Sequence, residues 1–105
     1  MVLSQLRDEA EFLLLSLLRR ALLHGMDCIL PVVRGQEDVL TLRYHLGGNQ
    51  CVVDIWKVEG QPVRYSIGNW SGVSRLGAFV RVCDFLRLPV EETERQLAER
   101  EGSGE

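Results

Sequence analysis

Three cysteines and two histidines are the residues of this 105-residue chain best suited to metal binding or nucleophilic catalysis. Such sites need their side chains at productive spacings, for example C-x-x-C or H-x-x-x-H. Cys28, Cys51 and Cys83 lie far apart in the sequence, and His24 and His45 complete no such pair. The cysteines stand among apolar neighbours, which is typical of reduced thiols packed as small hydrophobic side chains. We therefore predict no catalytic dyad, no metal site and no cofactor.

A glycine-rich stretch from Gly68 to Arg75 joins a predicted strand to a predicted helix. The backbone N–H groups at such a place can bind an anion. The stretch lacks the Gly-Lys-Ser/Thr ending of a P-loop and the G-x-G-x-x-G pattern of a dinucleotide site. We interpret it as an ordinary helix start in which Ser71 is the N-cap.

The remaining candidate is a group of four residues whose types are typical of binding surfaces: Arg43, Asp54, Trp56 and Arg64. Tryptophan and arginine are the residues most enriched at the centres of protein interfaces. A tryptophan beside arginines can also stack on the bases of single-stranded nucleic acid. Whether these side chains meet depends on the elements that carry them.

Leucines and alanines at helical spacing predict a helix of about six turns from Leu3 to about His24, with Gly25 placed to end it. Four large apolar residues, Phe12, Leu15, Leu22 and Leu23, lie outside the main apolar stripe of this helix. A sheet can cover only one side of a helix, so we expect the surface around Phe12, Leu15 and Leu22 to be a second candidate surface for a partner.

A period of two between Cys28 and Ile67 predicts four strands joined by short loops, which favours an antiparallel meander. Pro31 cannot donate a hydrogen bond, so the first strand should be an edge or carry a bulge. The predicted strands are 28–34, 39–46, 51–58 and 63–67.

The turns determine which side chains share a face of this sheet. A two-residue turn after Leu46 and a three-residue loop at 59–61 place Leu40, Leu42, Tyr44, Cys51, Val53, Ile55, Val63, Tyr65 and Ile67 on the core face. The opposite face then carries Thr41, Arg43, His45, Val52, Asp54, Trp56, Arg64 and Ser66, with Leu30 and Val32 from the first strand. A one-residue slip in the last hairpin would bury Trp56.

Helical spacing returns after Gly68 and again near Pro89, where an acidic helix begins that would repel the phosphates of DNA. The chain is therefore predicted to be one α+β domain over residues 1–101: a long N-terminal helix, a four-stranded antiparallel meander and one or two C-terminal helices, with the helices on one sheet face. Residues 102–105 are expected to be a disordered tail. This order of elements resembles the layout of dimeric chaperones of secreted effectors, without a shared motif.

Three interpretations of the second sheet face follow. A further helix could cover it, it could bind protein or a second copy of the chain, or it could bind single-stranded nucleic acid through Trp56, Arg43 and Arg64. A small-ligand protein or enzyme is a further alternative, with Tyr44, Tyr65 and Cys51 lining a pocket between sheet and helices. The net charge of −3 and the acidic residues around the face count against nucleic acid.

Composition and targeting signals complete the sequence-based prediction. The 46% hydrophobic content is typical of a folded domain. The N-terminus has no signal-peptide pattern, and its apolar run is shorter than the ~20 residues of a membrane span. We therefore expect a cytoplasmic, non-enzymatic protein-interaction module of the adaptor, chaperone or inhibitor type that forms a homodimer and binds neither membrane nor nucleic acid.

Overall fold

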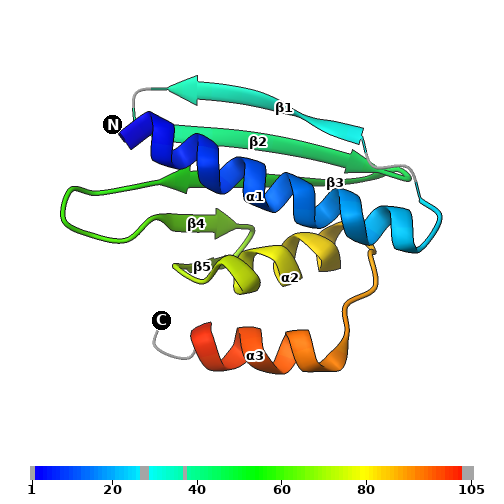
Figure 1. Ribbon diagram of the computed structural model, residues 1–105. Helices are drawn as coiled ribbons and strands as arrows, with labels where there is room; N and C mark the ends of the chain where they lie inside the picture. The colour runs from blue at the N-terminus through cyan, green and yellow to red at the C-terminus, as the bar shows by residue number, and fades with distance from the viewer. Residues whose placement is uncertain (1, 27–28, 37, 103–105) are drawn as a thin grey trace.

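The computed structural model describes residues 2–26, 29–36 and 38–102 (Figure 1). Helix α1 (Val2–Leu23) precedes five strands, β1 (Ile29–Gln36), β2 (Val39–Leu46), β3 (Asn49–Trp56), β4 (Arg64–Ile67) and β5 (Trp70–Gly72), which are followed by helices α2 (Arg75–Leu86) and α3 (Glu92–Gly102). The strands are antiparallel and adjacent in chain order. The predicted α+β meander is confirmed, and it contains a fifth strand. Cys28 and the predicted tail, except for Gly102 at the end of α3, lie outside the described residues.

Strand β5 was not predicted, and it changes the account of the glycine-rich stretch. Ser71 lies in β5, where it pairs with Ser66 of β4. The prediction that Ser71 is the N-cap is therefore wrong. Ser74 caps α2, and its hydroxyl oxygen accepts a hydrogen bond of 2.8 Å from the backbone N–H of Gly77. Arg75, which was predicted within this stretch, is the first residue of the helix.

The two hairpins that decide the register of the sheet follow the predicted pairing. Leu46 pairs with Asn49 across a two-residue turn in which Gly47 and Gly48 both have positive φ, as a type I′ hairpin turn requires. Trp56 pairs with Arg64, so the loop spans residues 57–63 instead of 59–61. The longer loop leaves the pairing unchanged, because residues at both strand ends move into the loop together.

Helices α1 and α2 lie side by side on one face of the sheet (Figure 1). This arrangement agrees with the prediction that the helices share one face, while α3 packs chiefly on α2. The core between helices and sheet consists of side chains from every layer, including Leu6, Leu13, Leu17, Leu40, Leu42, Tyr44, Val53, Ile55, Tyr65, Ile67, Val82, Cys83 and Leu86. The predicted core face of the sheet is confirmed, since its residues in β2, β3 and β4 are buried and Val63 packs against them.

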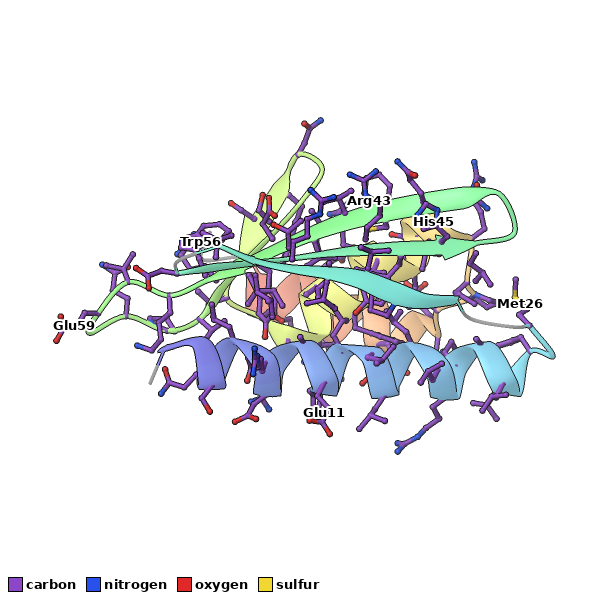
Figure 2. The ribbon with its side chains drawn as sticks, turned by 90° about the horizontal axis from the view of Figure 1, so that it is seen from above. Glu11, Met26, Arg43, His45, Trp56 and Glu59 are labelled. Atoms are coloured by element: carbon purple, nitrogen blue, oxygen red, sulfur yellow. The ribbon has the colours of Figure 1, made fainter. Side chains whose placement is uncertain are left out.

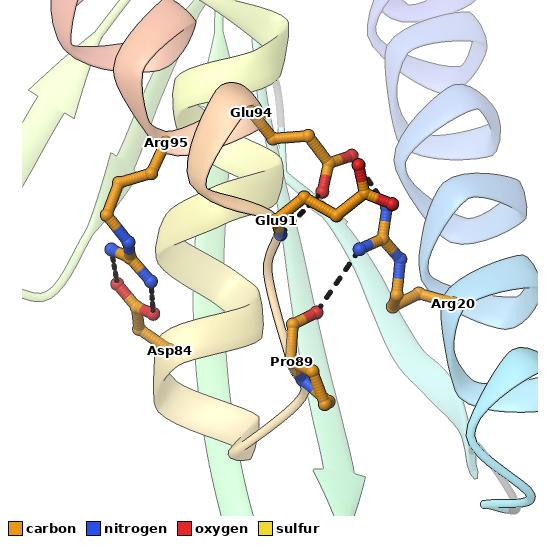
Figure 3. Close-up of polar contacts among 6 residues, drawn as sticks. All are labelled: Arg20, Asp84, Pro89, Glu91, Glu94 and Arg95. Atoms are coloured by element: carbon orange, nitrogen blue, oxygen red, sulfur yellow. Dashed lines mark hydrogen bonds and ion pairs between the residues drawn. The ribbon is translucent and has the colours of Figure 1, made fainter.

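Arginine side chains hold α3 in place (Figure 3). Arg20 of α1 donates to the carboxylate of Glu94 at 2.6 Å and to the carbonyl oxygen of Pro89 at 3.3 Å. Arg95 of α3 forms two hydrogen bonds with the carboxylate of Asp84 in α2, at 2.8 and 3.0 Å. A two-bond contact such as that between Arg95 and Asp84 fixes the relative orientation of the two side chains as well as their distance. The contacts of Arg20 and Arg95 join α3 to both helices of the core layer.

Candidate functional site

The face of the sheet opposite the helices, here called the outer face, carries the first group of predicted site residues. It consists of Thr41, Arg43, His45, Val52, Asp54, Trp56, Arg64 and Ser66. Figure 2 shows the labelled side chains Arg43, His45 and Trp56 pointing away from α1. Within the part of the chain that the structure describes, no helix lies over this face. The interpretation in which a further helix covers it is therefore wrong.

Strand pairing brings the predicted residues of the outer face together across three strands. Thr41 lies opposite Asp54, and its hydroxyl donates a hydrogen bond of 2.7 Å to the Asp54 carboxylate. Arg43 lies two residues further along β2, diagonal to Asp54, and Trp56 lies directly opposite Arg64. Neighbours at these positions are within reach of long side chains. The face therefore places an acidic group between two arginines, with the indole ring at one end.

The outer face continues onto the edge strand β1. Val32 lies opposite Arg43 and is 56% exposed, as predicted for an outward residue. Val32, Arg34, Thr41 and Arg43 line a shallow hollow of about 470 Å³. The side chain of Leu30, which was also expected on this face, lies outside the described residues.

The second group of predicted residues, Phe12, Leu15 and Leu22, is exposed on α1. Phe12 lies beside α2, where the Arg75 guanidinium is 4.8 Å from the centre of its ring. It lines a groove of about 250 Å³ between α1 and α2. Leu15 is three residues from Phe12 and Leu22 is seven residues from Leu15, so the three side chains are neighbours on the exposed side of α1. Of the three residues, only Phe12 lines the groove between α1 and α2.

A polar cluster that the sequence did not indicate joins α1 to β4 and α2. The Glu9 carboxylate accepts hydrogen bonds from the Tyr65 hydroxyl and from the Arg75 guanidinium, whose Nε lies 2.7 Å from Oε1. Burial opposes ionisation of Glu9, but the hydrogen bonds from Arg75 and Tyr65 and the charge of Arg75 outweigh it, so the pKa of Glu9 is lowered. Burial and the bond to Glu9 raise the pKa of Tyr65. The cluster holds elements together and presents no free acid or base.

The residues proposed to line a ligand pocket are packed in the core. Tyr44, Cys51 and Tyr65 are all buried within the hydrophobic cluster. Burial raises the pKa of the Cys51 and Cys83 thiols to about 12, so both are neutral at physiological pH. Cys28, the third cysteine, lies outside the described residues. Among the described residues, no three histidine, cysteine or acidic side chains gather as a metal site would require.

Comparison of the chain with protein-family models, with curated proteins and with solved structures finds no match. Over the described residues, no helix combines the length and the apolar character that crossing a membrane would require.

Proposed function

We propose that the protein is a non-enzymatic protein-interaction module that binds a partner protein on the outer face of its sheet and also self-associates. One observation carries this proposal: a sheet face with no described helix over it presents Trp56 directly opposite Arg64, with Arg43 further along the same face beyond Asp54. Large aromatic rings and guanidinium groups supply most of the binding energy in protein interfaces. Mixed apolar and charged surface of this kind is typical of interaction sites.

The charge distribution favours protein over nucleic acid as the partner. Asp54 lies within the face, between Arg43 and the strand that carries Ser66, and Glu59 lies in the loop beyond Trp56 (Figure 2). Phosphate backbones bind to continuous basic surfaces, and a carboxylate in the middle of the site repels them. A protein partner can meet the same pattern with charges of both signs. Single-stranded nucleic acid is therefore the alternative that the experiment must exclude.

A photocrosslinking amino acid at His45, on the outer face, tests this proposal in the cells that produce the protein. The matched control carries the same group at Gln96, which is exposed on α3. We expect a discrete protein adduct from position 45 that is absent from position 96. The adduct should disappear when Arg43→Glu or Trp56→Ala is added, because these changes remove the charge and the ring that the partner contacts.

Two results would overturn the proposal. An adduct pattern that is the same at both positions, or that is insensitive to Arg43→Glu and Trp56→Ala, would mean that the outer face has no specific partner. Binding of a labelled single-stranded oligonucleotide that weakens steeply with salt and on Trp56→Ala would assign the face to nucleic acid instead.

A further inference from the structure

Strand β1 forms an open edge of the sheet and is exposed on both of its faces. It pairs with β2 on one side and with no other described strand. Val32 on the outer face and Val33 on the core face are 56% and 55% exposed. An edge strand with unpaired backbone groups and apolar side chains is a template for another strand. Natural edge strands that stay unpaired are usually shielded by charges, by proline, by a bulge, by a covering element or by their shortness.

The core face of β1 is uncovered because α1 lies over the neighbouring strands. Val33 lies directly opposite Leu42, yet Leu42 is only 1% exposed and Val33 is more than half exposed. Between α1 and β1 runs a groove of about 290 Å³, whose lining includes Leu14, Val33, Arg7 and Glu11. Beyond the groove, Leu18 and Leu22 follow Leu14 along α1 at intervals of four residues. The groove is therefore lined mainly by apolar side chains, with Arg7 and Glu11 among them.

We propose that a second copy of this chain occupies this edge, with the two β1 strands pairing antiparallel about a two-fold axis through Val33. Val33 then faces Val33 of the second copy, and Val32 faces its Arg34. Opposed residues of an antiparallel pair lie on the same face, so the two sheets join into one with all helices on one side. Pro31 and the bulge between Ile29 and Val32 are confined to the start of β1, and the regular part of the strand remains available.

The charges beside the groove are arranged for a two-fold partner. Arg7, Ala10 and Glu11 line the groove together with Val33, so an axis through Val33 runs beside this part of α1. Arg7 and Glu11 lie on either side of Ala10 along α1. A two-fold axis at this point therefore directs Arg7 of each copy toward Glu11 of the other, as a self-complementary interface requires. A second copy satisfies both charges, whereas an unrelated apolar segment would leave them without partners.

The oligomeric state in solution tests this inference, measured by sedimentation velocity and light scattering at micromolar concentrations. We expect the wild-type protein to be a dimer and Val33→Arg to raise the dimer dissociation constant by at least about tenfold, because two like charges would meet at the axis. Val58→Arg is the matched control, since Val58 is a comparably exposed valine in the loop 57–63. It should leave the dimer unchanged. Circular dichroism verifies that both variants are folded.

Charge reversal tests the predicted two-fold contact itself. Arg7→Glu and Glu11→Arg should each weaken the homodimer, because one variant has only acidic and the other only basic groups at these positions. An equimolar mixture of the two variants should form heterodimers of near wild-type affinity. A contact within one helix cannot produce this rescue by mixing.

The possible failures distinguish this inference from the proposed function. The inference rests only on the part of the proposed function that concerns self-association, and not on partner binding at the outer face. A wild-type monomer would overturn the inference and leave partner binding on the outer face to its own crosslinking test. A dimer that survives Val33→Arg but dissociates with Arg43→Glu or Trp56→Ala would place self-association on the outer face and also overturn the inference. Absence of rescue in the mixture would overturn the axis through Val33.

Discussion

Trp56 of β3 lies directly opposite Arg64 of β4, on the face of the sheet that no described helix covers. Side chains at such opposed positions have Cβ atoms about 5 Å apart, so the indole ring and the guanidinium group are neighbours. Both side chains are partly exposed. The pair therefore belongs to a surface and does little to hold the core together, although the residue before Trp56 in the chain, Ile55, is completely buried.

Substitution of Trp56 should separate binding from stability. Trp56→Ala should lower the free energy of unfolding by about 1 kcal/mol, because the ring is only partly buried. Ile55→Ala, the neighbouring change on the core face, should lower it by about 2–5 kcal/mol. Urea denaturation measures both values. Equal losses for the two variants would mean that the Trp56 ring is part of the core, and would contradict its assignment to a binding surface.

The Glu9 cluster should make stability depend on pH in acid. Because the pKa of Glu9 is lowered in the folded chain from its ordinary value of 4.5, the ionised carboxylate stabilises the fold above that value. This contribution is lost as the pH falls through the lower, folded-state pKa. Glu9→Gln should therefore reduce the free energy of unfolding at neutral pH, and its difference from wild type should shrink below pH 4.5.

Denaturation curves recorded over a range of pH test the Glu9 prediction. Tyr65→Phe is the partner variant, since it removes one donor to the carboxylate and leaves Arg75 in place. It should reduce the acid-dependent part of the stability by less than Glu9→Gln does. The lowered pKa of Glu9 would be contradicted if the difference in free energy of unfolding between Glu9→Gln and wild type stayed constant with pH or grew in acid.

The two described thiols should resist alkylation in the folded protein. Cys51 and Cys83 are buried, and burial raises the pKa of both to about 12, so little nucleophilic thiolate is present. Mass spectrometry after iodoacetamide treatment should show both residues unmodified in buffer and modified in denaturant. Rapid native modification of either cysteine would show that the core opens readily or that the thiol is reactive.

The parts of this fold that were predictable from sequence are those fixed by local patterns. Alternation along β2 and β3 assigns Leu42 to the core and Arg43 to the surface, and the Gly47-Gly48 turn aligns the two strands. A one-residue slip would expose every core side chain, so the register is strongly determined. The Trp56–Arg64 pairing follows from the same alternation, although the loop before β4 is longer than predicted.

The features that were missed depend on how elements are placed relative to one another. The spacing of α1 shows surplus apolar residues but not that the helix lies over β2 and β3, which leaves Val33 of β1 uncovered. The Glu9–Tyr65–Arg75 cluster joins residues that are distant in the sequence, so no local sequence pattern predicts it. Strand β5 is only three residues long, and the one signal for it was Gly68-Asn69, a dipeptide typical of tight hairpins.

The end of α2 provides a test of the local backbone. Arg87 caps this helix in the left-handed conformation, with φ 62° and ψ 33°, and is the only non-glycine residue with positive φ among those described. A side chain costs about 1–2 kcal/mol in this conformation, and glycine avoids that cost. Part of this gain in stability is offset, because glycine makes the unfolded chain more flexible and so raises the entropy lost on folding. Arg87→Gly should therefore raise the free energy of unfolding by about 0.5–1 kcal/mol. The matched control Arg81→Gly, at an exposed position inside α2, should lower it by about 1 kcal/mol. Urea denaturation measures both, and a loss of stability in Arg87→Gly would mean that the arginine side chain contributes more to the fold than its backbone conformation costs.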